Sequence, residues 1–251
     1  LIPALLGELI WSSAVLAALG FALQALLGIN FALAVFLAGI LAIFNTFRGG
    51  FWAVTYTDVL QLFLMFTGLI LVIPFIADHT PSFAEAWNFY QQKHRDNTPL
   101  SSFSTAIPWI DQILLLTLGG IPWGCYFQKV LACRSAQNAK TMSIIAAGAS
   151  LLSAIPAIVI GILATYLFHR DGLTIEAADT LPQTIAHYTP RWVMTFGLAA
   201  IASAILSSVD SSLLSSATLL TVNIVSPAFP SLSEQKLTIV NKIAVLLVGA
   251  C

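Results

Sequence analysis

The sequence predicts an all-α polytopic membrane protein. Of its 251 residues, 58% are hydrophobic and only 8% are charged, too few charged groups to cover a soluble domain of this size. The apolar residues form seven stretches, most of them near the roughly 20 residues that a helix needs to cross a bilayer. Because a backbone in lipid must satisfy its own hydrogen bonds, we expect these stretches to be helices.

The first three expected spans are separated by short breaks. They cover residues 1–27, 31–47 and 51–77. Gly28 and Asn30 lie in the first break, and Arg48-Gly49-Gly50 forms the second. The first span starts inside an apolar run, without an initiator Met or a signal peptide.

The last four expected spans cover residues 107–131, 141–168, 192–225 and 237–251. The final one has only about 15 residues, too few to cross a bilayer. We therefore expect one transmembrane domain over residues 1–251 that is a fragment truncated at both ends.

Lysine and arginine predict the orientation. They occur in three connections that alternate with two longer polar loops, at residues 78–106 and 169–191, in which acidic residues balance the basic ones. The positive-inside rule places the three connections in the cytoplasm and the two longer loops outside. The basic residues of the three connections are Arg48, then Lys129, Arg134 and Lys140, then Lys236 and Lys242.

The sequence lacks the motifs that mark several other classes of protein. The three cysteines, Cys125, Cys133 and Cys251, form no CxxC pair or disulfide framework. All four histidines lie in the two outward loops, and no two share a helix at metal-ligand spacing. There is no HExxH, Walker A or GxSxG motif and no basic nucleic-acid patch, so we expect neither an enzyme nor a nucleic-acid-binding protein.

Glu8, Asp58 and Asp210 are carboxylates inside apolar stretches. Ionised groups are costly there and usually face a cavity, an ion or a partner. The alternative is a structural hydrogen-bond network between helices. Glu8 is the weakest candidate, because it could lie near the cytoplasmic surface or the cut end.

The densest polar feature is the serine-rich segment 202–218. At about 100° per residue, one helix face collects small and hydroxyl residues, with Asp210 on the flank beside Ser203 and Ser207. Close helix packing explains such a face. A sodium ion explains it equally well, since hydroxyls and helix carbonyls are hard oxygen ligands. The face comprises Ala204, Ser207, Ser208, Ser211, Ser215 and Thr218.

A helix break is expected at Gly119-Gly120-Ile121-Pro122. Proline removes a backbone donor and clashes with the preceding turn. Unwound helices at membrane depth line cavities, and transporters bind substrates at such breaks. Trp123 directly follows the break, and Trp11 lies well inside the first span.

Several of these segments resemble a known family. Residues 49–61, Gly-Gly-Phe-Trp-Ala-Val-Thr-Tyr-Thr-Asp-Val-Leu-Gln, resemble a segment shared by the sodium:solute symporter family. Residues 2–11, 119–131 and 207–212 resemble its choline-transporting branch. The resemblance implies a LeuT-like inverted-repeat helix bundle, of which the chain holds about seven transmembrane helices, the fourth to the start of the tenth of thirteen.

The resemblance also implies roles for individual residues. Ala204 through its carbonyl and Ser207 and Ser208 through their hydroxyls match sodium ligands. Asp58 matches a carboxylate used in sodium coupling or release, and Asp210 matches a ligand for a second cation. A dependence on chloride is implied as well, without a candidate residue.

Trp11 and Trp123 match aromatic walls of a choline cage. This match has an independent physical reason: a quaternary ammonium donates no hydrogen bonds and is held by cation–π faces, each contributing about 0.5–2 kcal/mol. Gly124-Cys125 departs from the bulkier, more polar pair of choline carriers. The resemblance implies that the family's broken helix, which supplies the remaining sodium ligands and cage walls, is not part of residues 1–251.

We therefore expect sodium-coupled uptake of choline across the plasma membrane by alternating access. An alternative is a sodium symporter for another small solute, such as proline, a sugar or a vitamin. A remote alternative is an intramembrane aspartyl protease that uses Asp58 and Asp210. The expected partners are choline, sodium and the lipid bilayer; the sequence does not indicate an oligomeric state.

Overall fold

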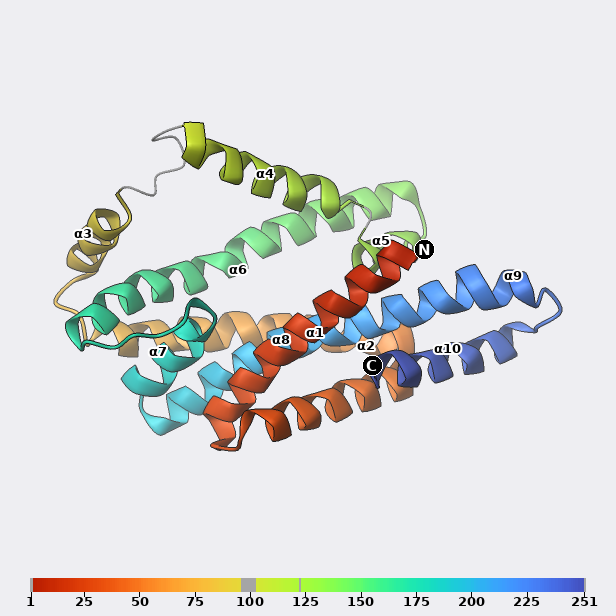
Figure 1. Ribbon diagram of the computed structural model, residues 1–251, viewed down its shortest axis with the longest axis horizontal. Coiled ribbons are helices and arrows are strands. Elements are labelled where there is room, and N and C mark those ends of the chain that lie inside the picture. The colour runs from red at the N-terminus through yellow and green to blue at the C-terminus, as the bar shows by residue number, and fades with distance from the viewer. Residues whose placement is uncertain (1, 96–102, 122, 251) are drawn as a thin grey trace. The chain divides into compact units, whose positions relative to one another are not determined.

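The computed structural model describes residues 2–95, 103–121 and 123–250 of the chain, and its secondary structure in these ranges is helical throughout (Figure 1). Leu1, Pro122, Cys251 and part of the expected outward loop 78–106 lie outside these ranges. The long helices are α1 (Ile2–Leu27), α2 (Phe31–Ala77), α4 (Phe103–Gly119), α6 (Ala136–Arg170), α8 (Arg191–Leu220) and α10 (Glu234–Gly249). The short ones are α3 (Phe83–Lys93), α5 (Gly124–Leu131), η2 (Ala177–Asp179), α7 (Thr180–Tyr188), the π-helical η3 (Thr221–Val225) and α9 (Ser226–Ala228).

Four helical segments are long and apolar enough to cross a membrane: α1, α2, α6 and the run from α8 through α9. The 47 residues of α2 contain two of the expected spans. The prediction of a multi-pass, all-α membrane protein is therefore confirmed for the described residues.

Gly50 separates the two halves of α2. Its backbone is not helical (φ 57°, ψ −164°), a left-handed conformation that favours glycine. Contacts in the first half advance along α8 in the chain direction, whereas contacts in the second half run the opposite way, so the chain reverses at Gly50. Before the break, Ala42 packs with Val209 and Leu213, and Phe47 packs against the cluster that contains Ala217. After it, Asp58 contacts Ser207, and Gly68 lies against Ala200.

The expected break in the span 107–131 is also present. Helix α4 ends at Gly119, where the amides of Gly120 and Ile121 turn back to carbonyls of the last helical turn. Helix α5 begins at Gly124, with Trp123 in an extended conformation before it (φ −64°, ψ 122°). Two helices therefore replace the single span that the apolar run suggested.

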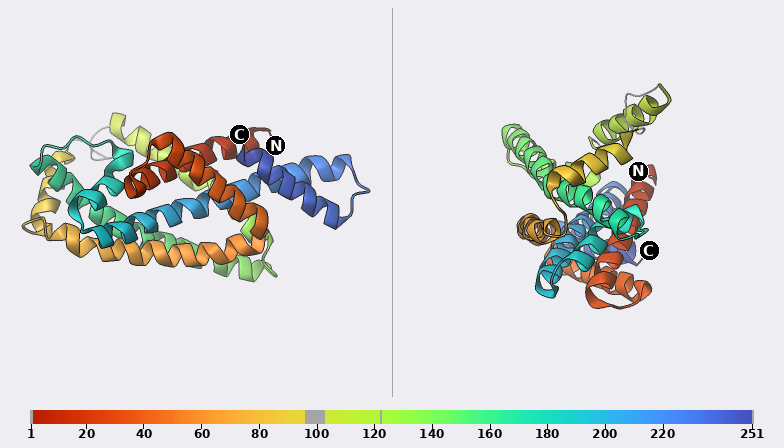
Figure 2. Two further views of the ribbon diagram at one scale, coloured as in Figure 1. Left: turned by 90° about the horizontal axis from the view of Figure 1, so that it is seen from below. Right: turned by 90° about the vertical axis from the view of Figure 1, so that its left-hand side faces the viewer.

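The chain forms two compact units, the first made of Leu1–Leu69 and Arg191–Cys251. Here α1 packs along α8, and α10 runs back beside the C-terminal part of α8 (Figures 1 and 2). Small residues also allow α2 to pack closely in this unit: Ala34, Ala38 and Ala42 are fully buried. A side chain at Gly68 would overlap Ala200 of α8.

The second unit is Ile70–Pro190. Helices α3 and α7 both pack on α6, whose C-terminal half supplies the buried side chains Ile160, Leu163 and Leu167. Ser135 caps the start of α6 and Ser82 caps the start of α3, each accepting a bond from a backbone amide three residues on.

Candidate functional site

Three carboxylates meet the polar middle of α8. Asp210 belongs to α8 itself, Asp58 comes from the second half of α2, and Glu8 comes from α1. Serine suits this position because its small side chain lets helices approach closely while its hydroxyl bonds to a neighbour. The arrangement therefore concentrates acceptors and hydroxyls within a few turns of one helix.

Asp58 and Ser207 are in direct contact. The Ser207 hydroxyl donates to Asp58 Oδ1 at 2.5 Å, within the range of a charge-assisted hydrogen bond. The Ser211 hydroxyl approaches Asp58 Oδ2 at 3.5 Å. Asp58 and Ser207 are both half-buried. The structure thus brings together two residues that the sequence assigned to sodium.

Ala204 and Ser208 occupy the adjoining turn. The Ser208 hydroxyl lies 3.4 Å from the Ala204 carbonyl oxygen, to which it donates. The Ala204 carbonyl therefore has a side-chain donor one turn later. Ala204, Ser207 and Ser208 present three oxygens on consecutive turns at a half-buried position.

Asp210 points elsewhere. Its carboxylate is fully buried and accepts bonds from Asn45 Nδ2 and, at 3.1 Å, from Thr46 Oγ1, both in the first half of α2. The sequence placed Asp210 on the flank beside Ser207, but the structure directs its side chain to a different helix segment. Asp210 and Asp58 therefore have different hydrogen-bond partners.

Glu8 is buried. It is 5% exposed, and it accepts from Ser212 Oγ at 2.7 Å and from Ser215 Oγ at 3.3 Å. Ser12 extends the cluster, with its Oγ 2.7 Å from that of Ser212. Its carboxylate therefore joins α1 to α8, and whether Glu8 lies near the cytoplasmic surface stays a prediction.

Two buried oxygens lack a hydrogen-bond partner among the described residues: Gln61 Oε1 and Ser216 Oγ. Gln61 lies one turn after Asp58 on α2, and the antiparallel register brings it to the level of the turn from Ala204 to Ser207. Sequence reasoning did not select Gln61, although it stands in the same Thr-Asp-x-x-Gln segment as Asp58. Gln61 Oε1 is therefore a further candidate oxygen ligand at this level of α2.

Asn45 and Thr46 were missed for a different reason. They are the polar pair inside the second apolar stretch and form no motif with Asp210, 164 residues or more away. Their presence in a span was a signal, but only the fold shows which carboxylate they contact.

Trp11 and Trp123 both keep a sizeable exposed area, 45% and 40%. Trp11 belongs to the first unit and Trp123 to the second. Their joint role as cage walls stays a prediction.

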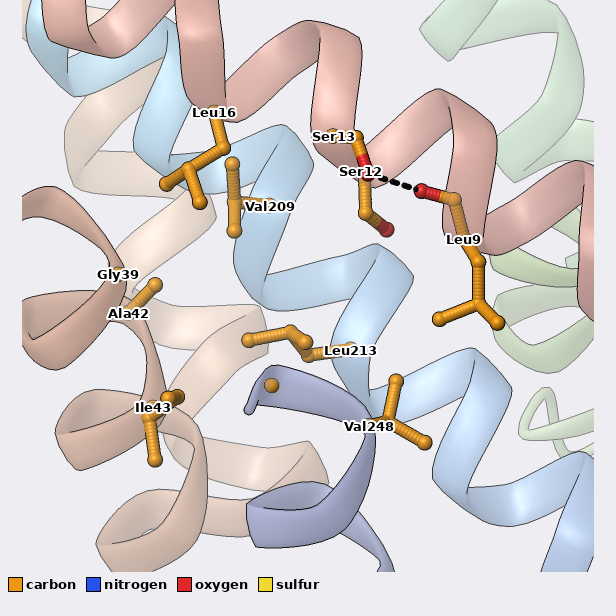
Figure 3. Close-up of a pocket in the computed structure, with 11 residues that line it drawn as sticks. Leu9, Ser12, Ser13, Leu16, Gly39, Ala42, Ile43, Val209, Leu213 and Val248 are labelled. Carbon is orange, nitrogen blue, oxygen red and sulfur yellow. Dashed lines mark hydrogen bonds between the residues drawn. The ribbon is translucent and has the colours of Figure 1, made fainter. Parts of the chain in front are cut away.

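The first unit also contains a cavity of about 50 Å³ between α1, α2, α8 and α10 (Figure 3). Leu16, Val209, Leu213 and Val248 give it a mainly apolar wall. The Ser13 hydroxyl beside it donates to the Leu9 carbonyl at 2.8 Å. Ser12, which also lines the cavity, connects it to the Glu8 and Ser212 cluster.

Comparison with known proteins gives curated relatives over 99% of the chain. The chain is 38% identical to the high-affinity choline transporter 1 of Caenorhabditis elegans and 37% identical to the human protein of that name. In each case it covers 45% of the relative, so the chain spans about half the length of these relatives.

A solved structure shares the fold. The substrate-bound outward-open state of a Na⁺-coupled sialic acid symporter superposes with a TM-score of 0.84 at 21% identity, over 98% of this chain and 55% of that one. This confirms the predicted LeuT-like bundle. The sequence profile of the sodium:solute symporter family matches residues 5–251. The chain therefore belongs to the sodium:solute symporter family.

Proposed function

We propose that this chain is part of a sodium-coupled secondary transporter that takes up choline across the plasma membrane. In this proposal, residues 1–251 form a single transporter domain with outward loops near 78–106 and 169–191. The main observation that supports sodium coupling is the 2.5 Å contact between Ser207 and Asp58, which joins two helices at a half-buried position.

Sodium would bind against the Ala204 carbonyl and the Ser207 and Ser208 hydroxyls, with the Asp58 carboxylate supplying negative charge. The hydroxyl of Ser207 is bonded to Asp58, and the oxygen retains lone pairs for a cation. Sodium prefers oxygen ligands as other hard cations do. Asp210 would hold a second cation between its carboxylate and the side-chain oxygens of Asn45 and Thr46.

Choline is the proposed substrate for two reasons. The relatives that match 99% of the chain are named high-affinity choline transporters. Trp11 and Trp123 offer aromatic faces, which hold a quaternary ammonium by cation–π attraction. Ordinary ammonium ions would leave N–H groups unpaired in such a cage. Chloride would accompany sodium, as the resemblance implies.

The mechanism is alternating access. Sodium binding from outside stabilises an outward-open arrangement, choline then fills the cage, and the bundle rocks to release both inside. Each sodium ion that moves inward down about 100 mV contributes roughly 2.3 kcal/mol, before any concentration gradient.

Uptake of labelled choline by the complete protein in proteoliposomes tests the proposal. Sodium should be required, and replacing it with N-methylglucamine should abolish uptake. Ser207→Ala should raise the sodium concentration needed for half-maximal uptake. The matched control is Ser216→Ala, which removes a buried hydroxyl of α8 that has no described hydrogen-bond partner. Uptake that persists unchanged without sodium would refute the coupling.

Competition by unlabelled solutes tests the substrate. Choline should compete with labelled choline, whereas proline, a sugar and a vitamin carboxylate should not. Sodium-dependent uptake of one of these solutes in place of choline would retain the carrier and overturn the substrate. The membership of the chain in a symporter family argues against the protease, and Asp58 and Asp210 bond to different partners.

A further inference from the structure

Helix α3 (Phe83–Lys93) is short, but its first and last turns both carry residues that favour helix ends. The Ser82 hydroxyl accepts from the Glu85 amide at 3.2 Å, which is half of a capping box, and Lys93 lies in the last turn. Its residues divide between three faces, and each face has a different environment.

One face of α3 docks on the end of α6. Ala86 is fully buried, and the Phe89 ring lies 5.9 Å from Tyr166 and 4.7 Å from His169 between ring centres. Glu85 accepts from the Tyr166 hydroxyl at 3.2 Å. These contacts fix the rotation of α3 about its own axis, and therefore where its other two faces point.

The second face is an aromatic stripe, defined here as Phe83, Trp87 and Tyr90. The spacing of four and then three residues places these side chains on one side of the helix. Phe83 is 48% exposed and Trp87 is 40% exposed, and the Trp87 and Tyr90 rings stack at 6.1 Å. The third face is polar and consists of Asn88, Gln91 and Gln92.

The depth of α3 in the membrane follows from the ends of two spans. Helix α2 ends at Ala77, five residues before the Ser82 cap, and α6 ends at Arg170. Arg170 Nη1 donates to the His79 carbonyl at 2.5 Å, so these two ends lie at the same level. Because Phe89 packs on Tyr166 and His169 in the last turn of α6, α3 lies at that level too.

We propose that α3 is an interfacial helix whose aromatic stripe rests in the phospholipid headgroup layer. Tryptophan and tyrosine favour this layer, where a ring can be apolar on one side and hydrated on the other. An apolar stripe opposite a polar face is typical of helices that lie in the plane of the interface. The occupant of the stripe is lipid, since the ends of two membrane spans fix the helix at this depth. The inference depends on the spans and not on choline or sodium.

Site-directed spin labelling of the complete protein in phosphatidylcholine nanodiscs tests the proposal. Nitroxides are attached to Trp87→Cys in the stripe and to Asn88→Cys on the polar face, in a background without the native cysteines. Collision with oxygen, which concentrates in lipid, is compared with collision with a water-soluble nickel chelate. We expect the ratio of oxygen to nickel accessibility to be several-fold higher at position 87 than at position 88.

Quenching by bromine-labelled phosphatidylcholine gives a second measurement without introduced cysteines. Trp87→Phe should remove a component of tryptophan fluorescence that brominated lipid quenches, and this difference decides the case if a labelled variant fails to fold. Equal accessibility ratios at positions 87 and 88, or an unquenched Trp87 component, would overturn the proposal. Protection of position 87 from both reagents would indicate a protein partner on the stripe and would also overturn it.

Discussion

Carboxylates in the two units meet opposite environments. Asp210, on α8 of the first unit, is fully buried, and the hydrogen bonds described for it come from the neutral side chains of Asn45 and Thr46. Asp171, just after α6 in the second unit, faces the guanidinium of its neighbour Arg170, with Nε 2.7 Å from Oδ1. The Tyr188 hydroxyl donates to the same carboxylate at 2.6 Å.

The difference shows how charge is compensated in each place. At the membrane surface the chain supplies its own cation, and the Arg170 bond, followed by the Tyr188 bond, lowers the pKa of Asp171 from 3.8 to about 2. In the apolar interior, neutral donors orient a carboxylate but leave its charge to be balanced. A buried carboxylate held in this way suits an exchangeable cation, whereas the surface carboxylate suits a permanent contact.

The largest effect should come from Asp58→Asn in the complete protein. This change preserves the shape of the side chain but removes the charge that the Ser207 hydroxyl and the proposed sodium both use. A charged hydrogen-bonding group contributes about 1.5–3 kcal/mol. We therefore expect the sodium concentration for half-maximal choline uptake to rise roughly ten- to a hundredfold. An unchanged sodium requirement would remove Asp58 from the proposed site.

Asp210→Ala should act next most strongly, and mainly on stability. It would leave the buried Thr46 hydroxyl and the Asn45 amide without their acceptor, at a cost of about 1–3 kcal/mol. The midpoint of thermal unfolding of the purified protein should fall. Asp210→Asn, which keeps an acceptor, should cost less stability while reducing the cooperativity of sodium activation. Full cooperativity in Asp210→Asn would argue against a second cation there.

The membrane spans were predictable because the length of an apolar run can be determined from consecutive residues, without knowledge of tertiary contacts. The reversal at Gly50 and the break after Gly119 also follow from glycine, which the sequence displays directly. Asp58, Ser207 and Ser208 were selected from their residue types and from a family resemblance, and the structure places the first two in contact.

Contacts between distant segments could not be predicted in the same way. Which helix Asp210 faces depends on the rotation of α8 against both halves of α2, and no local rule sets that rotation. Glu8 was underrated because an apolar run does not reveal the depth of a residue within the bundle. Its buried position depends on the packing of α1 along α8.

Gln61→Leu should have two smaller effects of opposite sign. It should raise the stability of the sodium-free protein and lower the stabilisation that sodium gives. An unpartnered buried acceptor costs about 1–3 kcal/mol, so an apolar side chain of similar size should stabilise the sodium-free protein by about 1 kcal/mol. If sodium uses the Gln61 oxygen, the same change should reduce the stabilisation that added sodium gives. Thermal unfolding with and without sodium chloride measures both, with N-methylglucamine chloride as the control salt. A variant that sodium stabilises as much as the wild type would exclude Gln61 from the site.

The smallest effect should come from Asp171→Asn, because Arg170 and Asp171 are both partly exposed and solvent screens their ion pair. The folded pKa of Asp171, about 2, lies below the ordinary 3.8, so its contribution to stability is fully present above about pH 4 and disappears as the pH falls through about 2. Wild type and Asp171→Asn should therefore differ slightly in thermal midpoint at neutral pH and converge in acid.

Burial, followed by the bond to Asp171, raises the pKa of Tyr188 to about 12. Tyr188→Phe should therefore lose a contribution to stability that is present at neutral pH and disappears as the pH rises through about 12. Neither variant should change the sodium requirement of uptake. A large shift in that requirement would mean that the surface contact and the buried carboxylates are coupled, and the contrast between the two units would fail.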